Sequence, residues 1–208
     1  MKRLEILCVL KSEGEYKAEH VERLHRQVLQ HLPDARFRCI SDVDVPCERM
    51  PMEHPWPGWW SKQNLFSPSI TGDFLYLDLD SAIVGDLSDL AGLDRLAIMR
   101  DVYRKDGLQS SIMFLPEADR AKVWAEWVKS PEIWMQMYRK GGDQAFLERL
   151  WLGKAAIIQD ELPGQVCSYK AHVRPAVRKD REFGNGAVPD GARVIAFHGL
   201  PRPWQVGW

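Results

Sequence analysis

The sequence lacks three features that would place it in a specialised class: a long hydrophobic run, an excess of charge of one sign, and cysteines at CxxC spacing. Its apolar runs fall well short of the roughly 20 residues that a membrane-spanning helix needs. Its 28 basic and 29 acidic residues give a formal net charge of −1, which offers no positive excess to a nucleic-acid backbone. We therefore expect neither a transmembrane segment nor a nucleic-acid partner.

We also expect no export signal in the N-terminal residues, because Glu5 interrupts the first apolar stretch. Cys8 and Cys39 lie in apolar, strand-like runs, where cysteine behaves as a small core residue. We expect the four cysteines to be reduced and predict neither a disulfide nor a zinc site. The expected location is the cytoplasm, with a peripheral position on the inner face of a membrane as the alternative.

The first forty residues alternate between strand-like and helical patterns. Residues 4–10 form a short apolar run, and apolar positions then recur at helical spacing through Val21, Leu24 and Val28 until Pro33 stops the helix. Residues 35–40 are typical of a second strand. This strand–helix–strand order predicts a parallel sheet with helices on its faces.

The rest of the chain continues this alternation. Further strands are predicted at 74–77, 97–99, 112–115, 155–158 and 194–197, and helices at 62–66, 116–129 and 143–152. In the helix at 116–129 we expect Ala121, Trp124, Trp127 and Val128 to face inward. The predicted fold is a single α/β domain over residues 1–208, with a mixed, mainly parallel central sheet flanked by helices.

Two carboxylates, Asp78 and Asp80, directly follow the apolar strand at 74–77. Like charges this close repel unless a positive group compensates them, and Mg²⁺ or Mn²⁺ does so through carboxylate oxygens. In open α/β sheets, ligands bind beyond the carboxyl ends of the strands, which is where this pair falls. The plain alternative is one aspartate that caps a turn and another that is merely solvated.

The pair alone is compatible with two enzyme classes. It resembles the metal motif of sugar-nucleotide transferases. It also resembles the strand-end D-x-D of haloacid-dehalogenase-type phosphohydrolases, in which the first aspartate, here Asp78, is a nucleophile. The phosphohydrolase motif usually lies near the N-terminus and carries Thr or Val where this chain has Ala82.

Four segments, taken in order, resemble glycosyltransferase family 8, the group of glycogenin and the bacterial retaining galactosyltransferases. Residues 71–90, TGDFLYLDLDSAIVGDLSDL, resemble its metal-binding strand, and Lys62 lies upstream at the spacing of its donor-site lysine. Residues 141–144, GGDQ, match its G-x-D-Q motif. Residues 198–204, HGLPRPW, resemble its terminal H…G-x-x-K-P-W.

This resemblance implies a nucleotide-diphospho-sugar transferase (GT-A-like) fold that moves a hexose from a UDP-sugar to an acceptor hydroxyl with retention of configuration. The acceptor would be a glycan, a lipid-linked sugar or a protein. The resemblance further implies a donor-nucleotide half at about residues 1–100 and a sugar and acceptor half at about residues 101–208.

The resemblance also implies roles for single residues. Asp78, Asp80 and His198 would bind Mn²⁺ or Mg²⁺ at the donor diphosphate, and Asp143 and Gln144 would act in catalysis beside the sugar. Six further residues would contact the donor: Leu10, Lys11, Lys62, Asp101, Gly199 and Arg202. These roles suit the chemistry, because metal and cationic side chains stabilise the charge that develops on a leaving diphosphate.

The sequence departs from the family at three places. The usual position of the metal histidine holds Ala196, so His198 is taken as a ligand that has shifted along the loop. Arg202 replaces a lysine, and residues 109–111, QSS, replace an Asn-x-Gly that contacts the sugar. These departures leave open a third possibility, a non-catalytic protein that binds a sugar nucleotide or a glycan.

Three other features each have two interpretations. Asp143 could be only a helix N-cap. Trp56, Trp59 and Trp60 could stack on a sugar ring or pack locally. The basic stretch between Lys170 and Arg181 could be a solvated loop. It could instead be a lid that closes over phosphates, or a surface for an anionic acceptor or membrane headgroups. Its cationic residues are Lys170, His172, Arg174, Arg178, Lys179 and Arg181.

Overall fold

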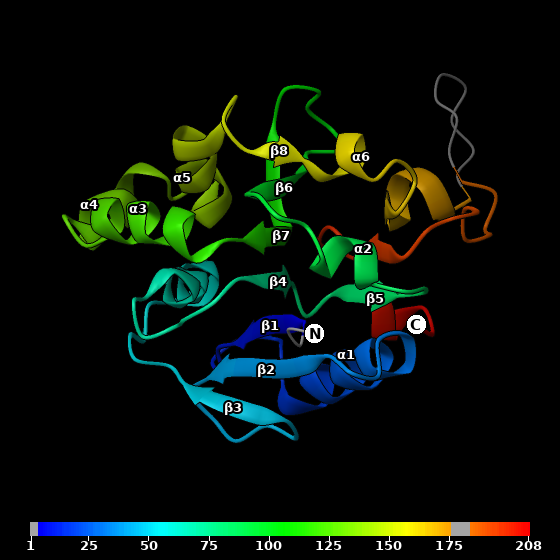
Figure 1. Cartoon of the computed structure of the whole chain (residues 1–208), viewed down its shortest axis with the longest axis horizontal. Helices are drawn as coiled ribbons and strands as arrows, with labels where there is room; N and C mark the ends of the chain where they lie inside the picture. The colour runs from blue at the N-terminus through cyan, green and yellow to red at the C-terminus, as the bar shows by residue number, and fades with distance from the viewer. Residues whose placement is uncertain (1–3, 176–183) are drawn as a thin grey trace.

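The computed structural model describes residues 4–175 and 184–208, and within these residues the strands form two sheets (Figure 1). The larger sheet has seven strands. In spatial order they are β3 (Glu48–Pro51), β2 (Arg36–Ser41), β1 (Glu5–Leu10), β4 (Phe74–Leu77), β7 (Leu108–Leu115), β6 (Ala97–Arg100) and β8 (Ala156–Ile157). Strand β7 runs antiparallel to both of its neighbours, and the other adjacent pairs are parallel. The predicted mixed, mainly parallel sheet is confirmed.

Side chains of the central strands alternate between two hydrophobic cores, one on each face of the sheet. From β1, Ile6 and Cys8 enter the core covered by α1 (Ala18–His31), whereas Leu7 and Val9 enter the opposite core. The second core is covered by η1 (Gly58–Phe66), α3 (Glu117–Trp127) and α5 (Gly142–Trp151). This division follows from the two-residue period of a strand, and it confirms the predicted β–α–β start.

The second sheet is small, and most of it was not predicted. Its order is β5 (Ser81–Ile83), β10 (Val194–Ala196) and β9 (Val166–Ser168), with β10 antiparallel to β5 and parallel to β9. Only the strand at 194–197 was expected. Strands β5 and β9 are three residues each, too short to show a periodic pattern. The second sheet matters because β10 carries the chain to the C-terminal segment.

Other elements differ from the expected pattern at their ends. The predicted strand at 155–158 gives way at Ile158 to α6 (Ile158–Glu161), and the predicted helix at 62–66 is the end of the longer 3-10 helix η1. Five further short elements were missed: β3, α2 (Ser88–Ala91), α4 (Pro131–Met137), η2 (Tyr169–Val173) and η3 (Pro203–Gln205). Of the predicted basic stretch, Arg178, Lys179 and Arg181 lie outside the described residues.

The predicted inward face of α3 is partly wrong. Trp127 is buried as expected, but Ala121 and Val128 are exposed and Trp124 is only half-buried. The buried stripe instead contains Val123 and Arg120. The Arg120 guanidinium donates to the carbonyl oxygens of residues 65, 70 and 72 and lies 4.6 Å from the Phe74 ring centre. A charged side chain can face inward here because backbone carbonyls satisfy it, which a hydropathy pattern cannot show.

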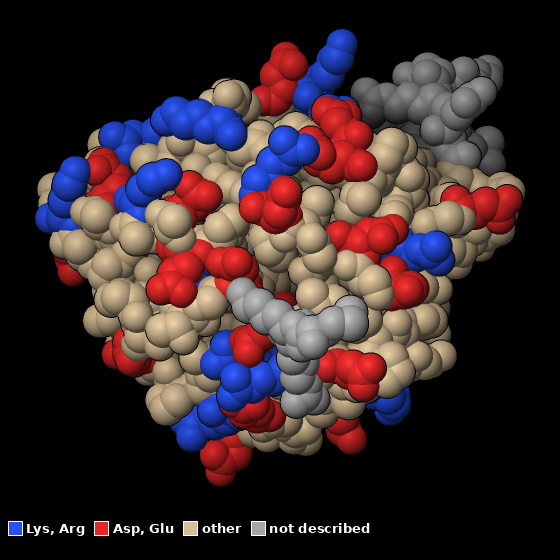
Figure 2. Space-filling model, in the orientation of Figure 1, with Lys and Arg blue, Asp and Glu red and all other residues tan. Residues whose placement is uncertain are grey.

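The surface agrees with the balanced composition. On the face shown in Figure 2, acidic and basic residues are intermixed over the surface. In the described part of the chain, no helix combines the length and the apolar character needed to cross a bilayer. Cys8, Cys39 and Cys167 are free and buried, and Cys47 is free and half-buried.

Replacing Trp127 with alanine tests which face of α3 is buried. Trp127 is 0% exposed and its neighbour Val128 is 47% exposed. Because Trp127→Ala leaves a large cavity, we expect it to lower the free energy of unfolding by about 3–5 kcal/mol. The control Val128→Ala should change it by less than about 0.5 kcal/mol. Urea denaturation measures both values, and losses of equal size would contradict the assignment.

Candidate active site

A cavity of about 690 Å³ opens beyond the carboxyl ends of β1 and β4. Its lining residues come from six segments of the chain: 9–16, 57–62, 76–80, 109–111, 140–144 and 197–202. Parallel strands place the loops that follow them at one edge of a sheet, so segments distant in sequence meet there. Nine of the eleven residues proposed from the sequence line this cavity: Lys11, Lys62, Asp78, Asp80, Asp143, Gln144, His198, Gly199 and Arg202.

Asp78 is held in place by groups from three elements. Its carboxylate forms an ion pair with Lys62 from η1, with Nζ 2.9 Å from one oxygen and 3.1 Å from the other. The Tyr76 hydroxyl donates to the same carboxylate. The backbone N–H of Asp78 donates to the carbonyl oxygen of Ser111 at 2.8 Å. The carboxylate is therefore oriented before any ligand binds.

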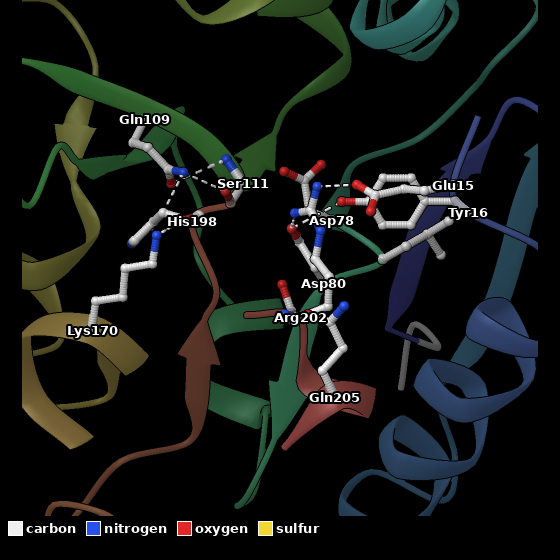
Figure 3. A network of polar contacts seen from close by, with 12 residues as sticks. Glu15, Tyr16, Asp78, Asp80, Gln109, Ser111, Lys170, His198, Arg202 and Gln205 are labelled. Atoms are coloured by element: carbon white, nitrogen blue, oxygen red, sulfur yellow. Dashed lines mark hydrogen bonds and ion pairs between the residues drawn. The ribbon is translucent and has the colours of Figure 1, made fainter. Parts of the chain in front are cut away.

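Asp80 is only 5% exposed. Burial raises the pKa of its carboxyl group to about 6, and the nearby negative charge of Asp78 adds to the shift. Two groups oppose this: the Tyr16 hydroxyl donates to the carboxylate at 2.9 Å, and Arg202 forms an ion pair with it (Figure 3). The second terminal nitrogen of the Arg202 guanidinium forms an ion pair with Glu15. Arg202 thus ties the C-terminal segment to Asp80 and to the loop after β1.

Arg23 holds the backbone on both sides of Asp80, and the sequence did not predict this role. It lies on α1, is buried, and donates from one guanidinium nitrogen to the carbonyl oxygens of Leu79 at 2.7 Å and Ser81 at 2.9 Å. These carbonyls flank Asp80 on both sides. The only signal available in the sequence was its place beside the buried helical stripe, and that position alone predicts a solvated arginine.

Asp143 is 4% exposed and lies at the first turn of α5. Its carboxylate accepts a hydrogen bond from the Ser110 hydroxyl at 2.7 Å and lies 3.4 Å from the ammonium of Lys62. It makes no capping hydrogen bond to the helix, so the interpretation as a simple N-cap is not supported. Burial raises the pKa of Asp143, against the opposing effect of Lys62.

Lys62 joins the two carboxylate sites. Its ammonium contacts both Asp78 and Asp143. Burial by itself would lower the pKa of Lys62, but the charges of Asp143 and Asp78 outweigh it and raise the pKa. Lys62 is therefore a permanent positive charge between two acids, a role that differs from the solvated lysine expected on a short surface helix.

His198 lines the cavity, and a contact with Gln109 fixes its ring on one side. Its Nδ1 lies 2.9 Å from Nε2 of Gln109, and its backbone carbonyl accepts from Lys170 (Figure 3). Its Nε2 is buried and has no hydrogen-bond partner within residues 4–175 and 184–208. Burial, followed by the charge of Lys170, lowers the pKa of His198 to about 4. The imidazole is therefore neutral at neutral pH.

Residues 109–111 connect the parts of the site. Gln109 contacts His198, Ser110 contacts Asp143, and the carbonyl of Ser111 accepts from Asp78. These three residues differ from the Asn-x-Gly of the family that the sequence resembles, yet the structure places all three on the cavity wall. Their signal was present as three polar residues within the otherwise apolar strand β7.

Two residues proposed from the sequence do not line the cavity. Leu10 is buried in the core beside α1. Asp101 accepts from the backbone N–H of Tyr103 and from the guanidinium of Arg104, and it reaches the site only through a 3.4 Å contact with Gln144. The side chain of Leu10 turned inward because it continues the alternation of β1. The loop after β6 directs Asp101 toward its own turn.

The predicted metal ligands are not gathered into a metal-binding cluster. Among the residues that the structure describes, no three or more His, Cys, Asp or Glu side chains are grouped as a metal site. The two aspartates are instead paired with cations, Asp78 with Lys62 and Asp80 with Arg202. The donor set still suits a hard divalent ion, because it offers two carboxylates and a neutral imidazole whose buried Nε2 has no partner.

The fold of this chain is similar to that of solved glycosyltransferases with a GT-A-like fold. The galactosyltransferase LgtC, in complex with donor and acceptor sugar analogues, matches with a TM-score of 0.62 at 14% identity, over 96% of this chain and 89% of LgtC. The bifunctional glycosyltransferase WbbM matches with a TM-score of 0.69 at 9% identity, over 97% of this chain and 47% of WbbM.

The glycosyltransferase GlyE of Streptococcus pneumoniae matches with a TM-score of 0.59 at 16% identity, over 78% of this chain and 47% of GlyE. The chain thus spans about half the length of GlyE and WbbM. At these identities the likeness shows the fold alone. No protein-family description matches the sequence, and no curated protein matches it.

Substitution of Gly142 tests the close packing at the start of α5. Gly142 has a φ of 62°, and an added Cβ would lie 2.8–2.9 Å from three atoms of the Trp59 indole. Gly153 has a φ of 71° but open space around the same position. Both alanine variants carry backbone strain of roughly 1 kcal/mol. We expect Gly142→Ala to lose about 1–3 kcal/mol more in chemical denaturation because of the clash. Equal losses in the two variants would refute this packing.

Proposed function

We propose that this protein is a metal-dependent glycosyltransferase that moves a hexose from a UDP-sugar to an acceptor hydroxyl, with retention of configuration. The observation that carries the proposal is the placement of Asp78, Asp80 and Asp143 around one cavity with Lys62 and Arg202. In a chain with a glycosyltransferase fold, this combination of acids and cations suits a metal ion and a diphosphate. The acceptor in this proposal is a glycan, a lipid-linked sugar or a protein.

Asp78, Asp80 and His198 would hold the metal, Mn²⁺ or Mg²⁺. When bound, the ion would supply a Lewis acid to the diphosphate of the donor. The fit rests on the buried, unpartnered Nε2 of His198 and on the two carboxylates at the end of β4. Tyr76 and Tyr16 orient those carboxylates through the hydrogen bonds that they donate.

Lys62 and Arg202 would bind the phosphates and stabilise the charge of the leaving nucleotide. Both pair with aspartates that line the cavity, so their positive charges border the space proposed for the anionic donor. Lys11 and Gly199 border the same cavity and would add to the donor site. Leu10 would contribute only main-chain contacts, because its side chain is in the core. Asp101 would act through Gln144.

Asp143 would face the anomeric carbon of the donor sugar, with Gln144 beside it. Its buried carboxylate is fixed by Ser110 and Lys62, which is the arrangement required of a group that stabilises or attacks a positively charged carbon. In this proposal most of the nucleotide contacts come from residues before about 100, and Asp143 and Gln144 from the later half face the sugar.

The fold bears differently on the two alternative functions, a phosphohydrolase and a non-catalytic binding protein. GlyE, LgtC and WbbM, which share the fold, are glycosyltransferases, so the fold gives no support to a phosphohydrolase with Asp78 as nucleophile. A non-catalytic protein that binds a sugar nucleotide has the same fold and the same cavity. Activity assays distinguish it from the proposed enzyme.

A thermal-shift panel of UDP-, GDP- and CDP-sugars, with and without Mn²⁺, tests the donor and metal assignments. At about 100 times the dissociation constant, a UDP-sugar with Mn²⁺ should raise the melting temperature by about 5 °C or more. Asp78→Asn and Asp80→Asn should abolish the shift. Asp44→Asn, a change at a fully exposed aspartate, should leave it intact. No shift with any nucleotide would overturn the proposal.

Asp143→Asn separates binding from catalysis. The amide keeps the shape of the side chain but removes its charge. We expect transfer and donor hydrolysis to fall by about a hundredfold or more, while the thermal shift with UDP-sugar and Mn²⁺ is retained. Release of UDP, measured by a coupled assay, reports the loss. A variant with wild-type turnover would exclude Asp143 from the chemistry.

A further inference from the structure

Trp59 differs from the two other tryptophans of its segment. Trp60 is buried and stacks on Trp127 with 5.4 Å between ring centres. Trp56 stacks on His54 at 4.6 Å. Trp59 is 52% exposed, borders the cavity, and makes no ring contact with another aromatic side chain of the described residues. Packing accounts for Trp56 and Trp60 and leaves the Trp59 indole without such a role.

One face of the Trp59 indole rests on Gly142. A Cβ added to Gly142 would lie 2.8 Å from Nε1 and 2.9 Å from both Cδ1 and Cε2. Nearly equal distances to three consecutive ring atoms place that point above the face of the ring, because a point beyond its edge would be much closer to one atom. Gly142 therefore supports one face of the indole, and any side chain there would displace it.

We propose that Trp59 is the platform on which the pyranose ring of the acceptor stacks, through the exposed part of its indole. An aromatic ring offers an apolar surface that matches the C–H face of a sugar, whose hydroxyl groups remain at the edge for hydrogen bonds. The proposal rests on the proposed function, because it assigns the second substrate of the same cavity. It resolves the two interpretations of the tryptophan cluster in favour of sugar binding for Trp59 alone.

The position of Trp59 favours the acceptor over the nucleotide. Its support, Gly142, directly precedes Asp143, so the platform lies next to the carboxylate proposed to face the anomeric carbon. Lys11, which is proposed to contact the donor, belongs to a different lining segment, residues 9–16. Lys140 borders the cavity as well, and its exposed ammonium has no ion pair within the described residues. Lys140 can therefore donate to a sugar hydroxyl.

The test measures the binding of sugars that lack a nucleotide. Methyl glycosides of glucose, galactose and mannose are added to the full chain with UDP and Mn²⁺, and saturation-transfer NMR reports which sugar protons contact the protein. At least one glycoside should bind the wild type. Trp59→Ala should weaken it by about tenfold or more, the loss expected for one stacking contact. Trp59→Phe, which keeps an aromatic face, should retain most of the binding.

Ile133→Ala is the matched control, because Ile133 is exposed to a similar extent, 55%, but does not border the cavity. It should bind the glycosides as the wild type does. Unchanged binding in Trp59→Ala, or no binding of any glycoside by the wild type, would overturn the platform. A loss of the UDP-sugar thermal shift in folded Trp59→Phe and Trp59→Ala would instead place Trp59 in the donor site and also overturn it.

The two proposals fail in different ways. If no sugar nucleotide stabilises the wild type, the proposed enzyme is wrong. A Trp59-dependent glycoside signal would then still show that the cavity binds sugars. If UDP-sugar and Mn²⁺ do stabilise the protein but glycoside binding is independent of Trp59, the enzyme stands and the platform is wrong. Thermal unfolding of each variant without ligand confirms that it is folded.

Discussion

The repulsion among three carboxylates around one cavity is the constraint on which the rest of the site depends. Asp78, Asp80 and Asp143 are held at the end of a buried strand and the start of a helix, where water screens them little. Lys62 compensates Asp78 and Asp143, and Arg202 compensates Asp80. These cations come from η1 and from the C-terminal segment, so charge balance at the site joins distant parts of the chain.

The C-terminal segment is part of the site as well as of the fold. Arg202 reaches Asp80, and two residues later Trp204 stacks on His20 of α1 with 3.7 Å between ring centres. From the same helix, Arg23 holds the carbonyls on both sides of Asp80. Helix α1 therefore supports the aspartate loop and the end of the chain together. A change in α1 can disturb the cavity without touching a ligand.

Gly142 and Trp59 shape the wall of the cavity at the start of α5. Gly142 allows α5 to begin with a positive φ and lets the Trp59 indole lie flat on the backbone. Asp143 then projects from the first turn toward Lys62 and Ser110. Gly142, which occupies the variable position of the G-x-D-Q pattern, thus has a steric explanation here: it makes room for an aromatic side chain beside the acid.

The sequence by itself determined the β–α–β start, the mainly parallel sheet and most of the proposed residues that line the cavity, because apolar periodicity marks buried elements and strand ends mark ligand sites. It could not reveal the inward-facing Arg120 or the role of Arg23, because both depend on carbonyls from other segments. It did not show that the Leu10 side chain lies in the core or that Asp101 pairs with Arg104, since spacing does not show where a side chain points. Only the tertiary structure decided which tryptophan borders the cavity and which cation faces each aspartate, because these depend on contacts between segments far apart in the chain.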